Sequence, residues 1–275
     1  MTQDASKPIW FKNEEDIKKQ EIKPKKFSIF VATPVFDNVS IHYFNACLEF
    51  QKHCVSNNIQ ASFQVMKSSL VTQGRNLCVS SFMESNHTHL LFVDSDIEFQ
   101  TQSIFKMIAS DKDVISVPYP LKQIFWDKAW ERISKGNIKN AKDLKFKGLY
   151  SYPMKVEDDK NILIKDGVIE VTHSPTGCML IKREVIEKMI KAYPDTEIVQ
   201  KTVINGELMN RPYLYNLFDT MHEPKTKKYL GEDFAFCKRW KDIGGKCHAL
   251  ITDRITHAGE HQYRGCFADE LIKTE

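Results

Sequence analysis

The sequence lacks the features that mark membrane-spanning and secreted proteins. Its richest apolar runs, residues 28–32 and 90–93, have the length of strands, far below the roughly 20 residues of a helix that spans a bilayer. Residues 1–26 are polar and of mixed charge and contain no apolar segment, so we expect no secretory signal. We therefore predict a soluble protein of the cytoplasm.

The cysteine pattern lacks any C-x-x-C pair and contains an odd number of residues. Neither a zinc knuckle nor a disulfide scaffold is therefore indicated. Buried free thiols in a reducing compartment are the simplest interpretation for all seven: Cys47, Cys54, Cys78, Cys178, Cys237, Cys247 and Cys266.

An excess of charge of one sign is also missing. The chain has 39 Lys and Arg against 36 Asp and Glu, a net charge of only +3, so no global field favours a nucleic-acid partner, although a local basic surface stays open. No Gly-x-Gly-x-x-Gly follows the first predicted strand, which excludes a Rossmann dehydrogenase.

What is present is an alternation of strands and helices. The 275 residues, 42% of them apolar, suffice for one large α/β domain. Alternating strands and helices predict parallel pairing through right-handed crossovers, and a Rossmann-like half-sheet in the first hundred residues. The predicted strands are 27–33, 61–66, 89–94, 114–117, 177–181 and 247–251, and the predicted helices are 41–53, 72–85, 103–109, 183–191 and 234–240.

The remaining segments complete the predicted organisation. We expect a flexible polar leader over 1–26, a single domain over 27–265 and a tail over 266–275. Residues 162–171 predict a β-hairpin with Asp166 and Gly167 at its turn. Residues 122–160 are Lys-rich and poorly periodic, which indicates an insertion over the carboxyl edge of the sheet, where loops carry function.

Two carboxylates, Asp94 and Asp96, follow a buried strand. This is the ligand-binding edge of an open α/β sheet, and two residues of extended chain at that point can turn both carboxylates toward one cation. Oxygen ligands suit Mg²⁺ or Mn²⁺ shared with a diphosphate. The competing interpretation is a pair of solvated turn residues.

A second acidic pair, Glu232 and Asp233, opens the predicted helix 234–240. Acidic residues in a first turn commonly stabilise the helix dipole or cap the helix. The functional interpretation is a general base beside an incoming hydroxyl.

Two further side chains have a functional and a structural interpretation. His257 lies in a late loop that can fold back over the cation, where an imidazole would favour Mn²⁺ over Mg²⁺. The alternative is a surface or core histidine whose hydrogen bonds are made within the protein. Arg75 lies near the start of the predicted helix 72–85, where the planar N–H donors of its guanidinium and the helix dipole would favour binding of phosphate. The alternative is a surface arginine.

These features together resemble a known family. Segments 28–34, 73–76, 92–97, 176–181, 231–233 and 255–257 occur in the order seen in GT-A glycosyltransferases, and look most like the small family-2-like enzymes of bacteria, phages and large viruses. The resemblance covers residues 27–263. It implies a mainly parallel central sheet flanked by helices, with a β-hairpin and a C-terminal acceptor region. The nucleotide-binding half would be 27–120 and the acceptor-binding half 121–265.

The resemblance also assigns roles to individual residues. Asp96 would bind Mn²⁺ or Mg²⁺ directly and Asp94 would touch the ribose or a metal-bound water, so that the metal set is Asp94, Asp96 and His257. Asp233 would be the base of an inverting reaction, with Glu232 beside it. The nucleotide-sugar would contact Thr33, Pro34, Phe36, Arg75, Asn76, Asp94 and Ser95, and Gly177 would leave room for the donor sugar.

Two residues of the insertion have open interpretations. Lys122 is either a second cation for the diphosphate or a solvated loop lysine. Trp126, four residues further on, either stacks on a sugar ring or packs in the core.

The function implied is a hexosyltransferase-like enzyme that moves a sugar from a nucleotide-sugar, a UDP-sugar in the first instance, to an acceptor hydroxyl. The acceptor is a glycan, a protein or a modified nucleic-acid base. One alternative is a sugar-nucleotide nucleotidyltransferase, disfavoured because no Gly-rich loop bearing Arg or Lys follows the first strand. The other is a non-catalytic glycan-binding or scaffold module on a degenerate GT-A fold, disfavoured by the intact Asp94, Asp96, Asp233 and His257.

Overall fold

The structure is a computed structural model, and it describes residues 27–147, 149–158, 161–199, 201–204 and 206–259. Within these ranges no helix is long and apolar enough to cross a membrane. The predicted leader 1–26, the tail 266–275 and Cys266 lie outside the described residues. The six other cysteines are free thiols.

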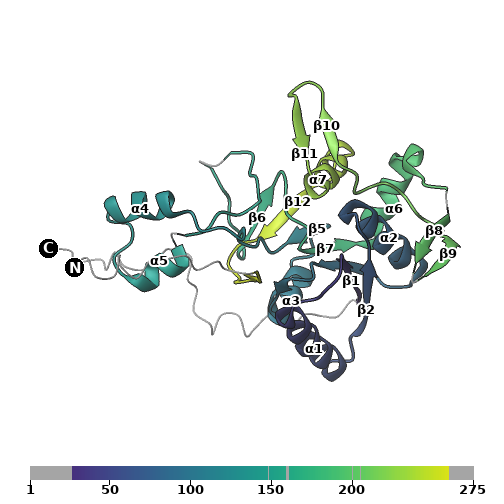
Figure 1. Cartoon of the computed structure of the whole chain (residues 1–275), viewed down its shortest axis with the longest axis horizontal. Coiled ribbons are helices and arrows are strands. Elements are labelled where there is room, and N and C mark those ends of the chain that lie inside the picture. Colours follow the sequence, from purple (N-terminus) through teal and green to yellow (C-terminus); the bar gives the residue numbers. More distant parts are fainter. Residues whose placement is uncertain (1–26, 148, 159–160, 200, 205, 260–275) are drawn as a thin grey trace.

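A central sheet of seven strands organises the described part of the chain, in the order β2-β1-β3-β7-β5-β12-β6 (Figure 1). β1 is parallel to β2 and β3, and β12 is parallel to β5. β7 runs antiparallel between β3 and β5, and β6 antiparallel to β12. The strands are β1 (Ser28–Val35), β2 (Gln60–Lys67), β3 (His89–Val93), β5 (Val114–Ser116), β6 (Val168–Val171), β7 (Cys178–Lys182) and β12 (Cys247–Leu250).

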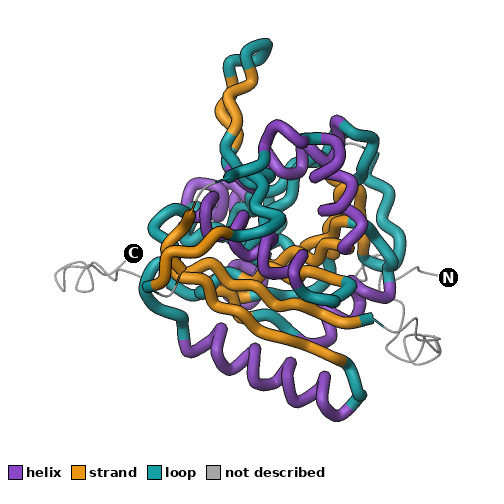
Figure 2. The backbone as a smooth tube through the Cα atoms, turned by 90° about the vertical axis from the view of Figure 1, so that its right-hand side faces the viewer, coloured by secondary structure: helices purple, strands orange, loops and turns teal. Residues whose placement is uncertain are grey.

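Helices cover both faces of this sheet because successive strand residues point to opposite sides. Ile29 and Val31 of β1 pack with α1 and α3, whereas Phe30 and Ala32 pack with α2, α6 and α7. The long helix at the bottom of Figure 2 is α1, lying along its face of the sheet. The helices are α1 (Ile41–Ser56), α2 (Val71–Glu84), α3 (Thr101–Ala109), α6 (Arg183–Ala192) and α7 (Glu232–Asp242).

These observations confirm the predicted fold class. The sheet is mainly parallel and flanked by helices, and its first half alternates strand and helix from β1 to β3. The boundaries of the predicted elements agree within a few residues because most coincide with a buried apolar run or stripe; β2, of which only Met66 is buried, is an exception.

The insertion between β5 and β6 differs from the prediction. It contains two helices, α4 (Trp126–Ser134) and α5 (Ala141–Lys147), which extend beyond β6 on the side away from β2 (Figure 1). Neither helix was predicted from the sequence, and within α4 only Ala129 is buried.

The hairpin expected at residues 162–171 is correct in its turn but wrong in its pairing. Asp166 and Gly167 have φ values of 52° and 76°, as a tight hairpin turn requires, but a single bridge joins Lys165 to Val168. β6 pairs along its length with β12 instead, which buries its apolar face in the main sheet.

Three small antiparallel pairs within the described ranges were not predicted. The pair β8 (Lys201–Ile204) and β9 (Glu207–Asn210) is one, and β10 (Met221–Glu223) with β11 (Lys228–Leu230) forms another, which projects from the body (Figures 1 and 2). The third joins β4 (Ile97–Glu98) to β13 (Thr256–His257), and this one shapes the candidate site.

Candidate active site

The acidic turn 94–96 lies between β3 and β4, at the carboxyl end of the parallel strands. Its backbone is held on several sides: the Asp94 N–H donates to the Gly177 carbonyl (3.0 Å), and the Ser95 carbonyl accepts from the Ser40 N–H (2.8 Å). The Ile97 N–H closes the turn by donating to the Asp94 carbonyl (3.0 Å). The two carboxylates are therefore presented by a fixed backbone, but they face different partners.

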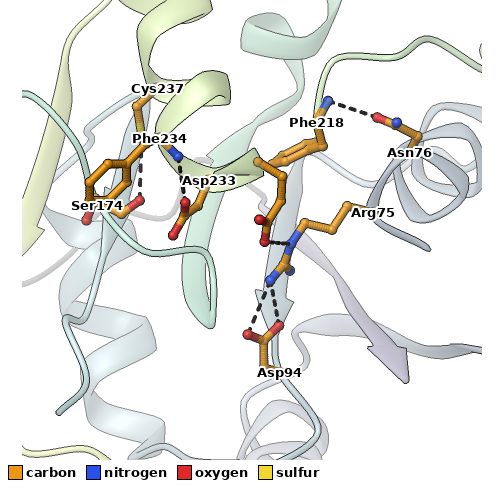
Figure 3. A network of polar contacts seen from close by, with 9 residues as sticks. Arg75, Asn76, Asp94, Ser174, Phe218, Asp233, Phe234 and Cys237 are labelled. Atoms are coloured by element: carbon orange, nitrogen blue, oxygen red, sulfur yellow. Dashed lines mark hydrogen bonds and ion pairs between the residues drawn. The ribbon is translucent and has the colours of Figure 1, made fainter. Parts of the chain in front are cut away.

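Asp94 faces Arg75, which is buried in α2 (Figure 3). The Arg75 Nη2 donates to both Asp94 oxygens, at 2.9 and 3.2 Å, and Nε donates to Glu232 Oε1 at 3.3 Å. Burial by itself would lower the pKa of Arg75, but the carboxylates of Asp94 and Glu232 outweigh it and raise the pKa. Arg75 thus joins the ends of β3 and α7 through one buried charge.

Asp96 faces His257, which the β4–β13 pairing brings back from the far end of the described chain. The Ala258 N–H donates to the Asp96 carbonyl (2.7 Å), and His257 Nε2 lies 3.4 Å from Asp96 Oδ2. Lys122 Nζ donates to the same oxygen. Burial alone would raise the pKa of Asp96, but hydrogen bonds from His257 and Lys122 prevail and lower it to about 2.

A backbone hydrogen bond orients the His257 ring. Nδ1 lies 2.8 Å from the Pro120 carbonyl, and a carbonyl only accepts, so Nδ1 carries the hydrogen. In the protonated ring Nε2 donates to Asp96, which is the contact that lowers the pKa of Asp96, whereas the neutral ring presents the Nε2 lone pair to the same carboxylate. An imidazole lone pair and a carboxylate oxygen that face each other repel unless a cation lies beside them. Here the Lys122 ammonium, which donates to Asp96, supplies that positive charge.

Asp233 is the second residue of α7, next to Glu232. Its Oδ1 accepts a hydrogen bond from the Phe234 N–H (2.7 Å; Figure 3). Burial, followed by the nearby negative charge of Glu232, raises the pKa of Asp233 to about 6. A carboxylate with a pKa near the working pH can accept a proton efficiently, so Asp233 has the electrostatic environment of a general base.

Tyr119 is a residue of this site that the sequence analysis missed. Its ring contacts the His257 ring edge-on, with centroids 4.8 Å apart. Burial, followed by the negative charge of Asp94, raises the pKa of its hydroxyl. A Cβ on Gly177 would lie only 2.4 Å from this ring. The place of Tyr119 just after a buried strand, at the functional edge, was the available signal.

The other residues predicted to bind the nucleotide are placed as follows. Phe36 follows the last residue of β1 and is 73% exposed. Its ring is therefore accessible for stacking on a planar ligand. Thr33 is buried, and its hydroxyl already has a hydrogen-bond partner in the Tyr43 hydroxyl (2.7 Å). Ser95 is half-buried, and Pro34 is buried against Gly74 of α2.

Two expectations about phosphate and sugar contacts are changed by the packing. Arg75 and Asn76 are each 2% exposed; Asn76 donates to Asn216 Oδ1 (2.8 Å) and accepts from the Phe218 N–H (3.0 Å). Both are thus engaged by protein groups. The space beside Gly177 is occupied by Tyr119 and Asp94, so a contact of Gly177 with a sugar stays a prediction. Trp126 is 62% exposed, so its core-packing interpretation is wrong.

The donor set fits a divalent cation only in part. Within the described residues, no group of three or more His, Cys, Asp or Glu side chains could hold a metal ion, because Asp94 is turned to Arg75 while Asp96 and His257 form a separate pair. That pair has the right chemistry: a carboxylate oxygen and an imidazole whose other nitrogen donates to a backbone carbonyl. Two protein ligands with phosphate oxygens and waters are a common environment for such ions.

Cavities lie near these residues and also away from them. One of about 220 Å³ is lined by Asn76, Asn216 and Asp219, among others. The larger one, about 890 Å³, lies at the opposite edge of the sheet between α6 and the end of α7, lined by Asp113, Lys188 and Trp240 among others. Its open, charged lining contains none of the residues of the candidate site.

Comparisons with known proteins give distant likenesses. No protein-family model matches the sequence, and no curated relative matches it. Among solved structures, A197 from STIV is 19% identical over 85% of this chain and 87% of that chain, with a TM-score of 0.46. A glycosyltransferase involved in the glycosylation of the major capsid of PBCV-1 is 12% identical over 61% and 66% (0.32). UDP-glucose pyrophosphorylase complexed with UDP-glucose is 8% identical over 82% and 90% (0.38).

Proposed function

We propose that this protein is a metal-dependent glycosyltransferase of the GT-A kind, which transfers a sugar from a nucleotide-sugar, in the first instance a UDP-sugar, to an acceptor hydroxyl with inversion. One observation carries the proposal: Asp233, a carboxylate with a pKa of about 6, lies at the same sheet edge as Asp94 and Asp96, close enough for Asp94 to raise its pKa. A base beside a diphosphate-binding edge is what sugar transfer to a hydroxyl requires.

Each residue of the site has a distinct role in the proposed reaction. Asp233 takes the proton of the acceptor hydroxyl as its oxygen bonds to the anomeric carbon from the face opposite the leaving group. The bond from that carbon to the phosphate oxygen breaks, and the nucleoside diphosphate leaves with its electron pair. Glu232 and Arg75 keep the environment of Asp233 fixed, since Arg75 joins Glu232 to Asp94.

Asp96 and His257 would hold the cation, and Mn²⁺ or Mg²⁺ would supply charge neutralisation of the diphosphate leaving group. Lys122, which is 40% exposed and rests on Asp96, is the residue best placed to move onto a phosphate oxygen. Phe36 is available to stack on the base. Arg75 acts in this proposal as a positioning residue rather than as a phosphate ligand, because its Nη2 and Nε donors already meet two carboxylates; the buried Nη1 has no hydrogen-bond partner among the described residues.

The experiment is a donor panel with a matched pair of variants. UDP- and GDP-sugars are incubated with Mn²⁺, and release of the nucleoside diphosphate is measured for the native chain, for Asp233→Asn, and for Asp242→Asn. The control lies at the far end of the same helix, in an exposed ion pair with Lys238.

We expect Asp233→Asn to slow release by roughly 10²–10⁴-fold because the carboxylate is the proton acceptor, while Asp242→Asn stays near the native rate. Equal rates for Asp233→Asn and native protein would remove Asp233 from its role, and a product of unchanged anomeric configuration would exclude inversion. Pyrophosphate-dependent release of UTP would instead support a nucleotidyltransferase. No turnover of any donor by the native chain would support a binding module.

A further inference from the structure

The insertion between β5 and β6 carries charge that the rest of the chain does not share. Residues 122–147, here named the basic arm, contain eight Lys or Arg and three Asp or Glu, a net charge of +5. The whole chain carries only +3, so the remaining residues together carry −2. The excess is carried by Lys122, by the segment 135–140 and by α5, whereas α4 itself has two basic and two acidic residues.

An apolar stripe on α4 accompanies this charge. Trp126, Trp130 and Ile133 recur at helical spacing on one side of the helix, and they are 62%, 70% and 38% exposed. Ala129, on the adjoining part of the helix, is the buried residue that attaches α4 to the molecule. Two tryptophans on one exposed stripe cost free energy in water unless a surface covers them.

A second exposed apolar segment belongs to the same insertion. Ile162, Leu163 and Ile164 precede β6 and are 43%, 84% and 41% exposed. Three consecutive exposed aliphatic residues are unusual on a surface that faces only water. Both segments lie between β5 and β6, and Figure 1 shows α4 and α5 reaching beyond the sheet at the end of the molecule opposite β8 and β9.

We propose that the basic arm docks on an anionic lipid surface, with the α4 stripe in the interfacial layer and the lysines against the headgroups. An amphipathic helix with tryptophans on one side, in a segment rich in lysine, has the composition of interfacial membrane-binding helices. Tryptophan prefers the boundary between headgroups and acyl chains. Each Lys or Arg near an anionic bilayer adds attraction.

Other occupants fit these residues less well. A second copy of the chain would bring one +5 arm against another, and like charges repel at close range. A glycan would use the tryptophan rings but not Ile133, Ile162 or Ile164, and it would not require the positive charge. A nucleic acid would use the charge and the rings but would leave the aliphatic side chains uncovered.

The arm is joined to the candidate site at its base. Lys122 contacts Asp96, and the N–H groups of Leu121 and Phe125 donate to the carbonyls of Ser151 and Leu149, at 2.8 and 2.9 Å. Docking of the arm would therefore place the acidic turn near the lipid surface. The docking itself does not depend on the proposed transfer reaction, so membrane binding and catalysis can fail separately.

The test is co-sedimentation of the full chain with vesicles of phosphatidylglycerol and phosphatidylcholine, or of phosphatidylcholine alone, with the partition coefficient as readout. We expect the native chain to bind the anionic vesicles at least about tenfold more strongly than the neutral ones, and added salt to reduce the difference. The double variant Trp126→Ala/Trp130→Ala should bind the anionic vesicles about tenfold more weakly, as should Lys139→Glu/Lys142→Glu.

A matched control removes exposed apolar side chains from another place. Phe44 and Leu48 of α1 are 49% and 54% exposed, and Phe44→Ala/Leu48→Ala should bind as the native chain does. Thermal unfolding checks that all variants fold, which the exposure of the substituted residues favours. The proposal is overturned if the native chain does not bind anionic vesicles at low salt, or if the tryptophan variant binds them as well as native. It is also overturned if the arm instead drives self-association in the absence of lipid.

Discussion

Asp233 shows how a single side chain acquires a chemical property that its type does not have. An exposed aspartate has a pKa near 4, but burial and Glu232 raise the pKa of Asp233 to about 6. The rate of transfer should therefore fall about tenfold per pH unit below pH 6, since only the carboxylate accepts a proton. A pH–rate profile of the first-order step checks this, and a rate that stays flat down to pH 4 would contradict it.

The same shift predicts a dependence of stability on pH. Because the folded-state pKa lies above the unfolded one, Asp233 stabilises the fold below about pH 4, and that contribution is lost as the pH rises through about 6. Asp233→Asn has no such loss. The stability of the variant relative to native should therefore increase between pH 4 and pH 7, as urea unfolding at the two pH values would measure. An unchanged difference would mean that the Asp233 pKa is not raised.

Arg75 is the second residue with a strong expected effect. Arg75→Met removes the charge shared by Asp94 and Glu232 and leaves both carboxylates without it, which should destabilise the protein by about 3 kcal/mol. Urea denaturation measures this. As a control, adding Asp94→Asn and Glu232→Gln to Arg75→Met should restore part of the loss, because the unpaired charges are then gone. A loss below about 1 kcal/mol for the single variant would show that solvent compensates them.

At the scale of elements, the close packing of Gly177, just before β7, leaves no room for a larger side chain beside Tyr119 and Asp94. Gly177 lies against Tyr119 and Asp94, and a Cβ there would lie 2.4 Å from the Tyr119 ring and 3.0 Å from Asp94 Oδ2. Gly177→Ala should therefore displace the ring and cost about 1–3 kcal/mol of stability, as overpacking does. It should also weaken UDP binding, which calorimetry would measure.

The control for this prediction is a glycine with open space around it. Gly136 has no atom within 4 Å of its added Cβ but has a φ of +72°, so Gly136→Ala tests backbone strain alone. UDP affinity should be unchanged in that variant. If Gly177→Ala binds UDP as tightly as native, Tyr119 does not contribute to the site.

At the scale of the whole molecule, ligand binding should be visible as stabilisation. UDP at 100 times its dissociation constant should add about 2.7 kcal/mol, which for a domain of this size raises Tm by about 5–10 °C. We expect this shift with Mn²⁺ and not with EDTA, because Asp96 and His257 alone do not bind a diphosphate. Differential scanning calorimetry of the native chain and of Asp96→Asn checks it. An equal shift in EDTA would rule out a role of the cation in nucleotide binding.

Sequence reasoning identified most of the elements and part of the site because both follow local patterns. Buried strands such as β1 and β3 are continuous apolar runs, and the acidic residues that follow β3 are adjacent in sequence. The helical spacing of Trp126, Trp130 and Ile133 was present in the sequence, but it spans only two turns of a Lys-rich segment and faces solvent rather than the core, so the helices of the insertion were not predicted. The pairing of β6 escaped because the Asp166-Gly167 turn predicts a local partner, whereas burial against β12 was the stronger contribution.

The sequence by itself determined the α/β class, the order of the elements and the clustering of acidic residues at the carboxyl edge, since these depend on periodicity and on neighbours along the chain. Only the tertiary structure decided what each charged group faces. Arg75 turned inward to Asp94 and Glu232, and His257 folded back onto Asp96. Such contacts join residues as far as 161 positions apart, and the burial that sets the pKa of Asp233 exists only when the layers of the fold have closed around it.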